Sequence, residues 1–102
     1  MSEMIGYRFL PPAEEEMIEA SLFYEARSEG LGFEFLDGVQ RLIDLLREHP
    51  KVGQSVAGGF RRAVLRRFPF SVVYSEEPTE IVIIAVAHQK RQPGYWLGRD
   101  DG

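Results

Sequence analysis

The chain of 102 residues contains no cysteine, only two histidines and one tryptophan, and it has no long hydrophobic run. Without cysteine, neither a disulfide framework nor a thiolate metal site can form. No window approaches the roughly 18 apolar residues that a membrane-spanning helix needs. The first residues lack the basic and apolar regions of a signal peptide. We therefore expect a cytoplasmic protein with no membrane partner.

The scarcity of histidine also argues against a metal enzyme. His49 and His88 have no carboxylate cluster near them at the spacing that metal ligands need, so we expect no metal site and no cofactor. The hydrophobic content of 44% and the charged content of 27% are ordinary for a globular protein. The length suits one fold unit, and we expect residues 1–102 to form a single domain.

Charge is distributed unevenly along the chain. Residues 1–50 hold 11 acidic and 4 basic side chains, whereas residues 51–102 hold 8 basic and 5 acidic ones. The overall net charge is −4, which disfavours tight unspecific binding to nucleic acid, because that binding needs a strong positive field. Two interpretations remain open: a solvated acidic helical face beside an ordinary sheet, or a protein with one basic working side.

The hydrophobic pattern predicts one strand, two helices and then three strands. Residues 5–10 form the first strand, which Pro11 and Pro12 end. Helical periodicity covers residues 13 to about 28 and about 33 to 48, with a tight link between them that makes a helical hairpin. Residues 51–59 read as a loop. Three β-rich runs between residues 58 and 88 then indicate an antiparallel meander, the last of them apolar on both faces as in a central strand.

Two features of the first predicted helix bear on function. The acidic triplet Glu14, Glu15 and Glu16 stands near its N-terminus, where carboxylates stabilise the helix dipole, and we favour helix initiation over an acidic site. Ile18, Leu22 and Phe23 fall outside the buried stripe of this helix. They predict a second apolar contact, such as a protein partner.

The meander carries most of the basic residues. Arg61, Arg62, Arg66 and Arg67 lie within seven residues, more than solubility needs. Arginine is suited to binding carboxylates or phosphates, since its planar fork donates two parallel hydrogen bonds. We interpret these arginines as contacts for an anionic target or partner.

Several short segments, in this order, resemble the RelE/ParE superfamily of toxins from type II toxin–antitoxin systems. The segments that carry the resemblance are Phe23-Tyr24-Glu25, Gly30-Leu31-Gly32 with Phe35-Leu36, Glu48-His49-Pro50, Arg66-Arg67-Phe68-Pro69-Phe70 with Tyr74, Ala85-Val86-Ala87-His88, and Arg91-Gln92-Pro93-Gly94-Tyr95-Trp96. The resemblance implies an α+β fold of order β-α-α-β-β-β, with the helical hairpin packed on a small antiparallel sheet. It also implies a cognate antitoxin, ParD-like or RelB-like, that wraps and silences the toxin.

The superfamily divides by target. The ParE-like branch, which we favour, poisons DNA gyrase by binding and implies no catalytic residue. The alternative is a RelE-like ribosome-dependent endoribonuclease acting on mRNA. Its candidate catalytic residues would be Arg62, Arg67, His88, Arg91 and Tyr95, which can share proton transfer and phosphate stabilisation. Ser71 argues against cleavage, because it stands where nucleases of this superfamily carry an arginine facing the phosphate. We interpret His88 as a structural group that ends the last strand.

The resemblance and the residue pattern together assign two sets of site residues. The predicted antitoxin-binding residues are Ile18, Leu22, Phe23, Arg61, Arg62 and Arg66. The predicted target-binding residues are Arg67, Lys90, Arg91, Tyr95 and Trp96. For Tyr95 and Trp96 we also expect a packing role, holding the last residues of the chain onto the sheet.

Overall fold

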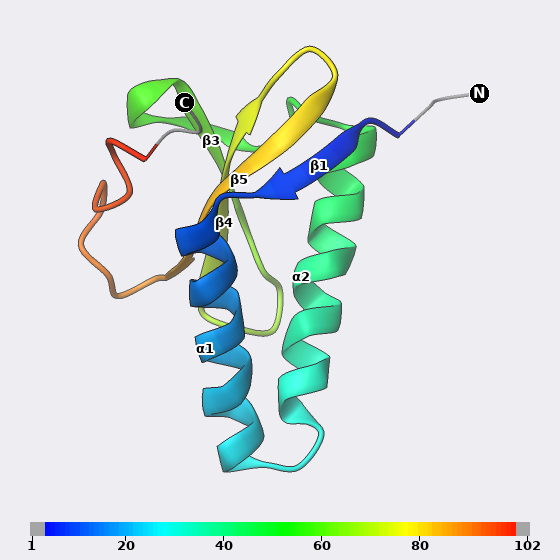
Figure 1. Cartoon of the computed structure of the whole chain (residues 1–102), viewed down its shortest axis with the longest axis vertical. Coiled ribbons are helices and arrows are strands. Elements are labelled where there is room, and N and C mark those ends of the chain that lie inside the picture. The colour runs from blue at the N-terminus through cyan, green and yellow to red at the C-terminus, as the bar shows by residue number, and fades with distance from the viewer. Residues whose placement is uncertain (1–3, 100–102) are drawn as a thin grey trace.

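The structure is a computed structural model that describes residues 4–99. Figure 1 shows its elements in chain order: β1 (Gly6–Phe9), α1 (Pro11–Arg27), α2 (Leu31–Glu48), β2 (Gln54–Val56), a short 3₁₀ turn η1 (Ala57–Gly59), β3 (Phe60–Val64), β4 (Phe70–Glu76) and β5 (Glu80–His88). The predicted order of a strand, two helices and the three strands of the meander is confirmed, and β2 is one further strand before the meander. No helix between residues 4 and 99 is long and apolar enough to cross a membrane.

The five strands form one sheet in the order β1-β5-β4-β3-β2. The meander of β3, β4 and β5 is antiparallel, as predicted. The sheet as a whole is mixed, however, because β1 runs parallel to β5, with Tyr7 opposite Ile81. The expectation of a purely antiparallel sheet was wrong on this point. The reason is that β1 pairs with the strand most distant in sequence, so no hairpin turn fixes its direction.

A second difference concerns residues 51–59, which we expected to form a loop. Gln54, Ser55 and Val56 instead pair with the first half of β3 as the edge strand β2. The chain reverses through Gly58 and Gly59, whose φ values of 87° and 79° lie in the left-handed region that glycine tolerates. A strand of three residues is too short to show alternation, which explains why the pattern did not reveal it.

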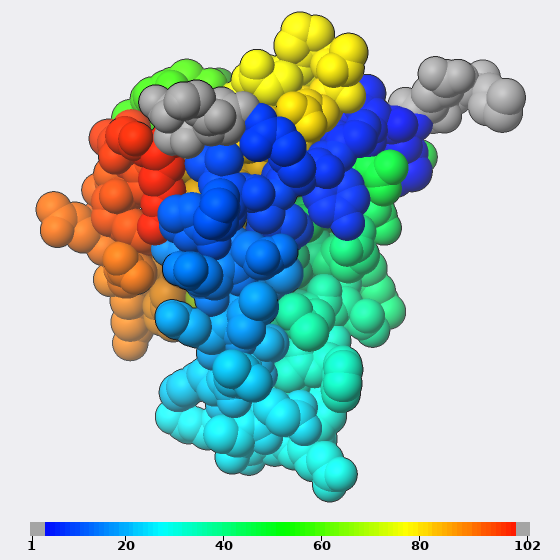
Figure 2. Space-filling model, viewed as in Figure 1, coloured from blue at the N-terminus to red at the C-terminus, as the bar shows by residue number. Residues whose placement is uncertain are grey.

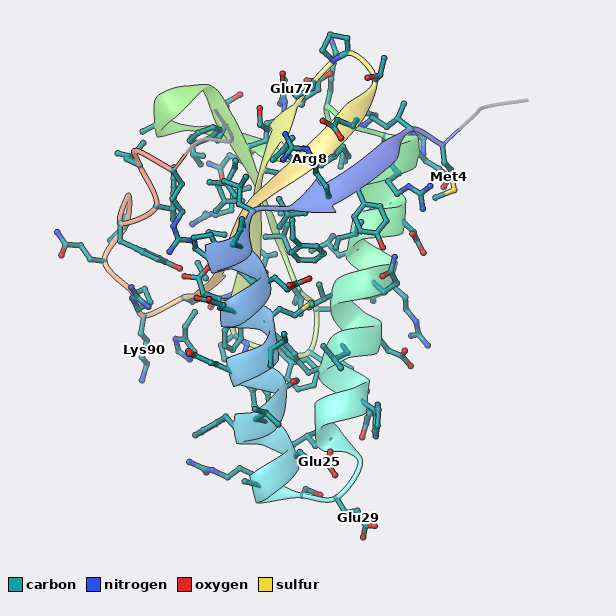
Figure 3. The ribbon with its side chains drawn as sticks, in the orientation of Figure 1. Met4, Arg8, Glu25, Glu29, Glu77 and Lys90 are labelled. Atoms are coloured by element: carbon teal, nitrogen blue, oxygen red, sulfur yellow. The ribbon has the colours of Figure 1, made fainter. Side chains whose placement is uncertain are left out.

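The two helices cross closely at their link. The Glu25 carboxylate accepts hydrogen bonds from the Gly30 and Gly32 backbone N–H groups, at 2.9 and 3.0 Å. A Cβ atom at Gly32 would lie only 2.5 Å from the Ser21 carbonyl oxygen, so only glycine permits this approach. Figure 3 shows Glu25 between the ends of the two helices, beyond the end of the sheet. The helical hairpin is therefore fixed by backbone contacts as well as by its apolar stripe.

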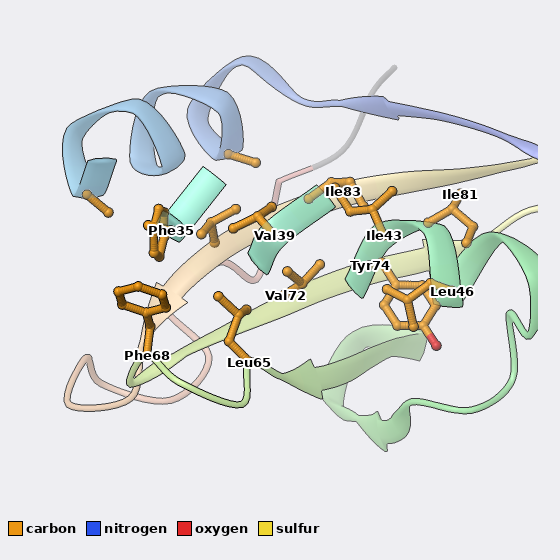
Figure 4. Close-up of a cluster of buried hydrophobic side chains, with 13 residues drawn as sticks. Phe35, Val39, Ile43, Leu46, Leu65, Phe68, Val72, Tyr74, Ile81 and Ile83 are labelled. Atoms are coloured by element: carbon orange, nitrogen blue, oxygen red, sulfur yellow. The ribbon is translucent and has the colours of Figure 1, made fainter. Parts of the chain in front are cut away.

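The helices cover one face of the sheet and enclose the main core. Figure 4 shows Phe35, Val39, Ile43 and Leu46 of α2 facing side chains of the sheet strands. A smaller cluster on the opposite face contains Val73, Val82, Ile84, Ala85, Leu10 and Trp96. Strand β5 contributes to both clusters and is buried from Ile81 to Ala87. The prediction of a central strand covered on both faces is thus confirmed.

Candidate functional site

The C-terminal segment, residues 89–99, folds back across the sheet face opposite the helices. It turns at Gly94, whose φ is 84°. Trp96, only 6% exposed, packs into the smaller core cluster, with its ring centroid 5.7 Å from that of Phe60. Figure 2 shows this segment running beside α1 on the molecular surface. The predicted packing role of Trp96 is confirmed, and its burial leaves little of the ring for direct contact with a target.

Glu16 fastens this segment to the body of the protein. Its carboxylate accepts hydrogen bonds from the Tyr95 hydroxyl at 2.6 Å and from the Arg99 guanidinium at 2.9 and 3.1 Å. It also accepts one from the Val86 backbone N–H at 3.0 Å, where β5 extends beyond the end of β1. Our interpretation of the acidic triplet as helix initiation alone was therefore wrong for Glu16. No local pattern distinguishes this glutamate from its two neighbours in the sequence.

A cleft of about 300 Å³ opens between the C-terminal segment and strands β3 and β4. We call it the sheet cleft. Its polar and charged lining comes from distant parts of the chain: Arg62, Ser71, His88, Gln89, Arg91, Gln92 and Tyr95. Four of the five residues proposed for a nuclease therefore meet here. The fifth, Arg67, does not line this cleft.

His88 ends β5 and is held by two local contacts. Its Nδ1 atom accepts a hydrogen bond from the Lys90 backbone N–H at 3.0 Å, and its ring packs edge-on against Phe70. An Nδ1 that accepts places the proton of a neutral imidazole on Nε2. In this arrangement neither ring nitrogen has a free lone pair to take a proton from a substrate. His88 can donate to an anion from Nε2, which agrees with its interpretation as a structural group.

The Tyr95 hydroxyl is also engaged in a hydrogen bond, which it donates to Glu16. Burial, together with the hydrogen bond to Glu16 and that carboxylate's charge, raises the pKa of Tyr95 well above its usual value. Its ring is covered by the Arg91 guanidinium, 3.9 Å from the centroid. The phenol proton therefore stays on Tyr95 and points to Glu16. The sheet cleft combines positive charge with an absence of any suitably placed proton acceptor among the described residues.

A second groove lies between α2 and β3, and we call it the α2–β3 groove. It has a volume of about 570 Å³. Its lining is an apolar floor with charged residues around it: Glu34, Gly38, Arg41, Leu42, Leu45, Val64, Leu65, Arg66, Arg67 and Phe68. Arg67 pairs with Glu34 at 3.0 Å, both side chains being largely exposed. The structure thus separates Arg67 from Arg91, Tyr95 and Trp96, which line the sheet cleft. Lys90, also predicted to bind the target, is exposed and does not line this cleft.

The predicted antitoxin-binding residues are also dispersed. Ile18, Leu22 and Phe23 are exposed on α1, as the pattern predicted, at 46%, 64% and 53%. Of these, only Phe23 lines a groove of about 310 Å³ beside β5, which also contains Glu16, Glu19 and Arg91. Arg62 lines the sheet cleft and Arg66 the α2–β3 groove. No single surface joins these residues.

Arg61 makes its hydrogen bonds and its ion pair within the protein itself. Its guanidinium donates to the carbonyl oxygens of Lys51 and Gly53, at 3.2 and 2.9 Å, and pairs with Glu76 at 3.5 Å. Arg61 therefore fixes the chain that leads into β2. Within residues 4–99, no group of three or more His, Cys, Asp or Glu side chains is placed to hold a metal ion.

Comparison with known proteins decides the family. Residues 7–93 match the family model described as "ParE toxin of type II toxin-antitoxin system, parDE". The chain belongs to the ParE toxin family. The resemblance to the RelE/ParE superfamily, and the preference for its ParE-like branch, are thereby confirmed.

A solved structure supports the fold of this ParE-family chain. It is titled "Chromosomal ParDE TA system from P. aeruginosa", and it superposes with a TM-score of 0.68 over 83% of this chain and 96% of that chain. The sequence identity is 19%, so the likeness establishes the fold alone. The comparison with curated proteins found no match.

Three residues with defined places in these sites were not predicted from the sequence. Glu16 and Arg99 join the C-terminal segment to α1, and Arg41 stands beside the α2–β3 groove. No local pattern marks any of the three, because each acquires its role from a partner distant in the sequence.

Proposed function

We propose that this ParE-family chain inhibits growth by binding DNA gyrase, without chemistry of its own, and that a cognate antitoxin neutralises it. The proposed absence of catalysis rests on the arrangement of the side chains in the sheet cleft. Tyr95 is hydrogen-bonded to Glu16, His88 accepts from Lys90, and Ser71 is 4% exposed and carries no charge. Cleavage of RNA needs a base, an acid and a charge on the phosphate.

The basic side chains of the sheet cleft support a binding role. Arg62 and Arg91 are exposed and line the same cavity. Figure 3 shows Lys90, which precedes Arg91 in the chain, pointing away from the body of the protein. Exposed cations around a cavity attract an acidic surface and steer its approach. We assign the target contact to Arg62, Lys90 and Arg91, with Tyr95 and Trp96 holding the segment that carries two of them.

A supercoiling assay with purified DNA gyrase tests this proposal. The wild-type chain should inhibit supercoiling, and Arg62→Ala/Arg91→Ala should inhibit at least about tenfold less, since an interface cation is typically worth 1 kcal/mol or more. Lys51→Ala, which removes an exposed cation outside the cleft, is the matched control and should behave as wild type. Unaltered supercoiling at saturating wild-type protein would refute gyrase as the target.

The alternative is mRNA cleavage at the ribosome, and the meeting of Arg62, His88, Arg91 and Tyr95 in one cleft is the observation that favours it. Primer extension on cellular transcripts after induction separates the two mechanisms. Codon-phased cuts that disappear in His88→Ala would establish the nuclease. DNA breaks with intact transcripts would establish gyrase poisoning. Growth that is unaffected by induction would contradict both and indicate an inactive copy.

Neutralisation is tested by co-expressing the small open reading frame adjacent to the toxin gene. We expect its product to restore growth and to purify with the toxin as a tight complex. Two proteins that stay separate, with growth still inhibited, would refute this part of the proposal.

A further inference from the structure

We propose that the groove of about 310 Å³ between α1 and β5 receives an aromatic side chain of gyrase, next to the acidic residue that the sheet cleft attracts. We call it the α1–β5 groove. Its lining is Glu16, Glu19, Ala20, Phe23, Tyr24, Phe70, Val86, His88 and Arg91. This inference rests on gyrase binding, as proposed above, and adds the chemistry of the segment that is bound. It moves Phe23 from the predicted antitoxin-binding residues to the target-binding ones.

The α1–β5 groove adjoins the sheet cleft, because His88 and Arg91 line both cavities. Arg91 is exposed, and its guanidinium carbon lies 3.9 Å from the centroid of the Tyr95 ring. This stacking holds a cation at the border between the two cavities. A gyrase segment whose acidic residue pairs with Arg91 therefore has neighbouring residues that lie over the α1–β5 groove.

A series of aromatic rings in edge contact lines the groove. The ring centroids of Phe23 and Tyr24 are 5.4 Å apart, and those of Tyr24 and Phe70 are 6.2 Å apart. The Phe70 centroid is in turn 5.0 Å from that of His88. Phe23 begins this series and is 53% exposed. A further ring placed here gains edge-to-face contacts and removes apolar surface from water, and both effects favour an aromatic occupant.

The charges at the groove favour an occupant without charge. Glu19 is exposed and makes no hydrogen bond or ion pair within residues 4–99, and Arg91 lines the same groove with the opposite sign. The Glu16 carboxylate is already engaged in its four hydrogen bonds. A cation in the groove would meet the like charge of Arg91, and an anion would meet that of Glu19. A neutral aromatic side chain avoids both penalties.

Binding of purified gyrase to toxin variants, measured by surface plasmon resonance, tests the groove. Phe23→Ser should raise the Kd about tenfold, as expected for the loss of an aromatic contact at an interface. Phe23→Tyr keeps the ring and should stay within about twofold of wild type. Leu22→Ser is the matched control, because Leu22 is an exposed apolar residue of α1 that does not line the groove, and it should also stay within about twofold. Circular dichroism and urea unfolding confirm that each variant is folded.

Two further measurements test the class of the occupant. Glu19→Gln should change the Kd by less than about threefold, because the occupant carries no charge. A tenfold weakening in Glu19→Gln would indicate a cationic occupant and overturn the proposal. Hydrogen exchange of gyrase in the complex with the wild-type toxin should protect a segment that contains both an acidic and an aromatic residue. Protection confined to segments without an aromatic residue would overturn it as well.

Failure of this inference is distinguishable from failure of the proposed function. A Phe23→Ser variant that binds gyrase as wild type does, or equal weakening in Leu22→Ser, would overturn the groove while leaving gyrase binding intact. Loss of antitoxin binding in that Phe23→Ser variant would then assign the groove to the antitoxin, and loss of self-association would assign it to a second copy of the chain. A wild-type chain that does not bind gyrase would refute the proposed function itself.

Discussion

Removing the Glu16 carboxylate is expected to free the C-terminal segment and to lower the stability of the whole fold. Glu16 accepts four hydrogen bonds, one from the backbone of β5, one from Tyr95 and two from Arg99. In Glu16→Ala, the Val86 N–H and the Arg99 guanidinium lose an anionic acceptor at the edge of the sheet. Arg99 keeps its bond to the Ile84 carbonyl oxygen, at 3.0 Å, which limits the loss.

The magnitude follows from burial. Removing one partner of a fully buried ion pair costs about 3–5 kcal/mol, and a hydrogen bond to a charged group contributes about 1.5–3 kcal/mol. The Arg99 and Glu16 side chains are 21% and 16% exposed, so solvent compensates part of the change. We therefore expect Glu16→Ala to lower the free energy of unfolding by about 2–4 kcal/mol. Glu16→Gln keeps the size and one acceptor oxygen, and should cost about half as much.

Trp96 makes detachment of the segment observable, because it is the only tryptophan in the chain, belongs to the C-terminal segment and is buried against the sheet. Urea unfolding followed by circular dichroism gives the free energy. Tryptophan emission in the absence of urea reports detachment of the segment as a shift to longer wavelength. Glu15→Ala, at an exposed position on the same helix, is the matched control and should change the stability by less than about 0.5 kcal/mol.

The reasoning would be refuted by a Glu16→Ala variant as stable as Glu15→Ala with unchanged tryptophan emission. That result would mean that Trp96 and the sheet hold the segment without the carboxylate. A loss of stability with unchanged emission in the folded state would be a partial failure. It would show that Glu16 supports the β5 edge and α1 but does not position the segment.

Three further predictions concern the framework. Gly32→Ala should lower the free energy of unfolding by about 1–3 kcal/mol in urea unfolding, because its Cβ would press on the Ser21 carbonyl oxygen; an unchanged midpoint would contradict the close crossing of the helices. Tyr74→Phe should cost about 1–3 kcal/mol by the same measurement, since the hydroxyl accepts from Gly53 N–H at 3.0 Å and donates to the Pro50 carbonyl at 2.7 Å; a neutral result would contradict that role. Burial raises the pKa of both Tyr74 and Tyr95, so the unfolded chain releases those protons first and stability should fall as pH rises above about 10. Alkaline denaturation measures this fall, and an equally steep fall in Tyr95→Phe would exclude Tyr95 as a cause.

The elements of the fold could be predicted because local patterns specify them. The apolar stripe of α2 predicts a buried helix, and the apolar residues on both faces of β5 predict a central strand. Neither prediction depends on the rest of the chain. The direction of β1 and the existence of β2 could not be predicted in the same way. Each depends on which distant strand is available to pair, and a strand of three or four residues carries too few positions to reveal its register.

The sites were less predictable than the fold, because their chemistry is assembled from distant partners. His88, Arg91 and Tyr95 lie close in the sequence, and they do line one cleft. The Lys90 backbone N–H orients the His88 ring and Glu16 orients the Tyr95 hydroxyl, and the pairing of Tyr95 with Glu16 spans 79 residues. A list of residue types with nuclease capability therefore did not indicate whether those groups were free to act.

The four arginines between residues 61 and 67 show this limit most directly. Strand alternation turns Arg61 toward the helices, where Glu76 and two carbonyl oxygens hold it, and turns Arg62 toward the sheet cleft. After β3 ends at Val64, the chain bends, and Arg66 and Arg67 reach the α2–β3 groove. Arg67 is paired with Glu34, and Arg66 has no ion pair or hydrogen bond within residues 4–99. One basic cluster in the sequence thus becomes a structural brace, a charge in the sheet cleft and one side of the α2–β3 groove. An acidic partner of this protein would therefore meet two separate basic surfaces, one at the sheet cleft and one at the α2–β3 groove.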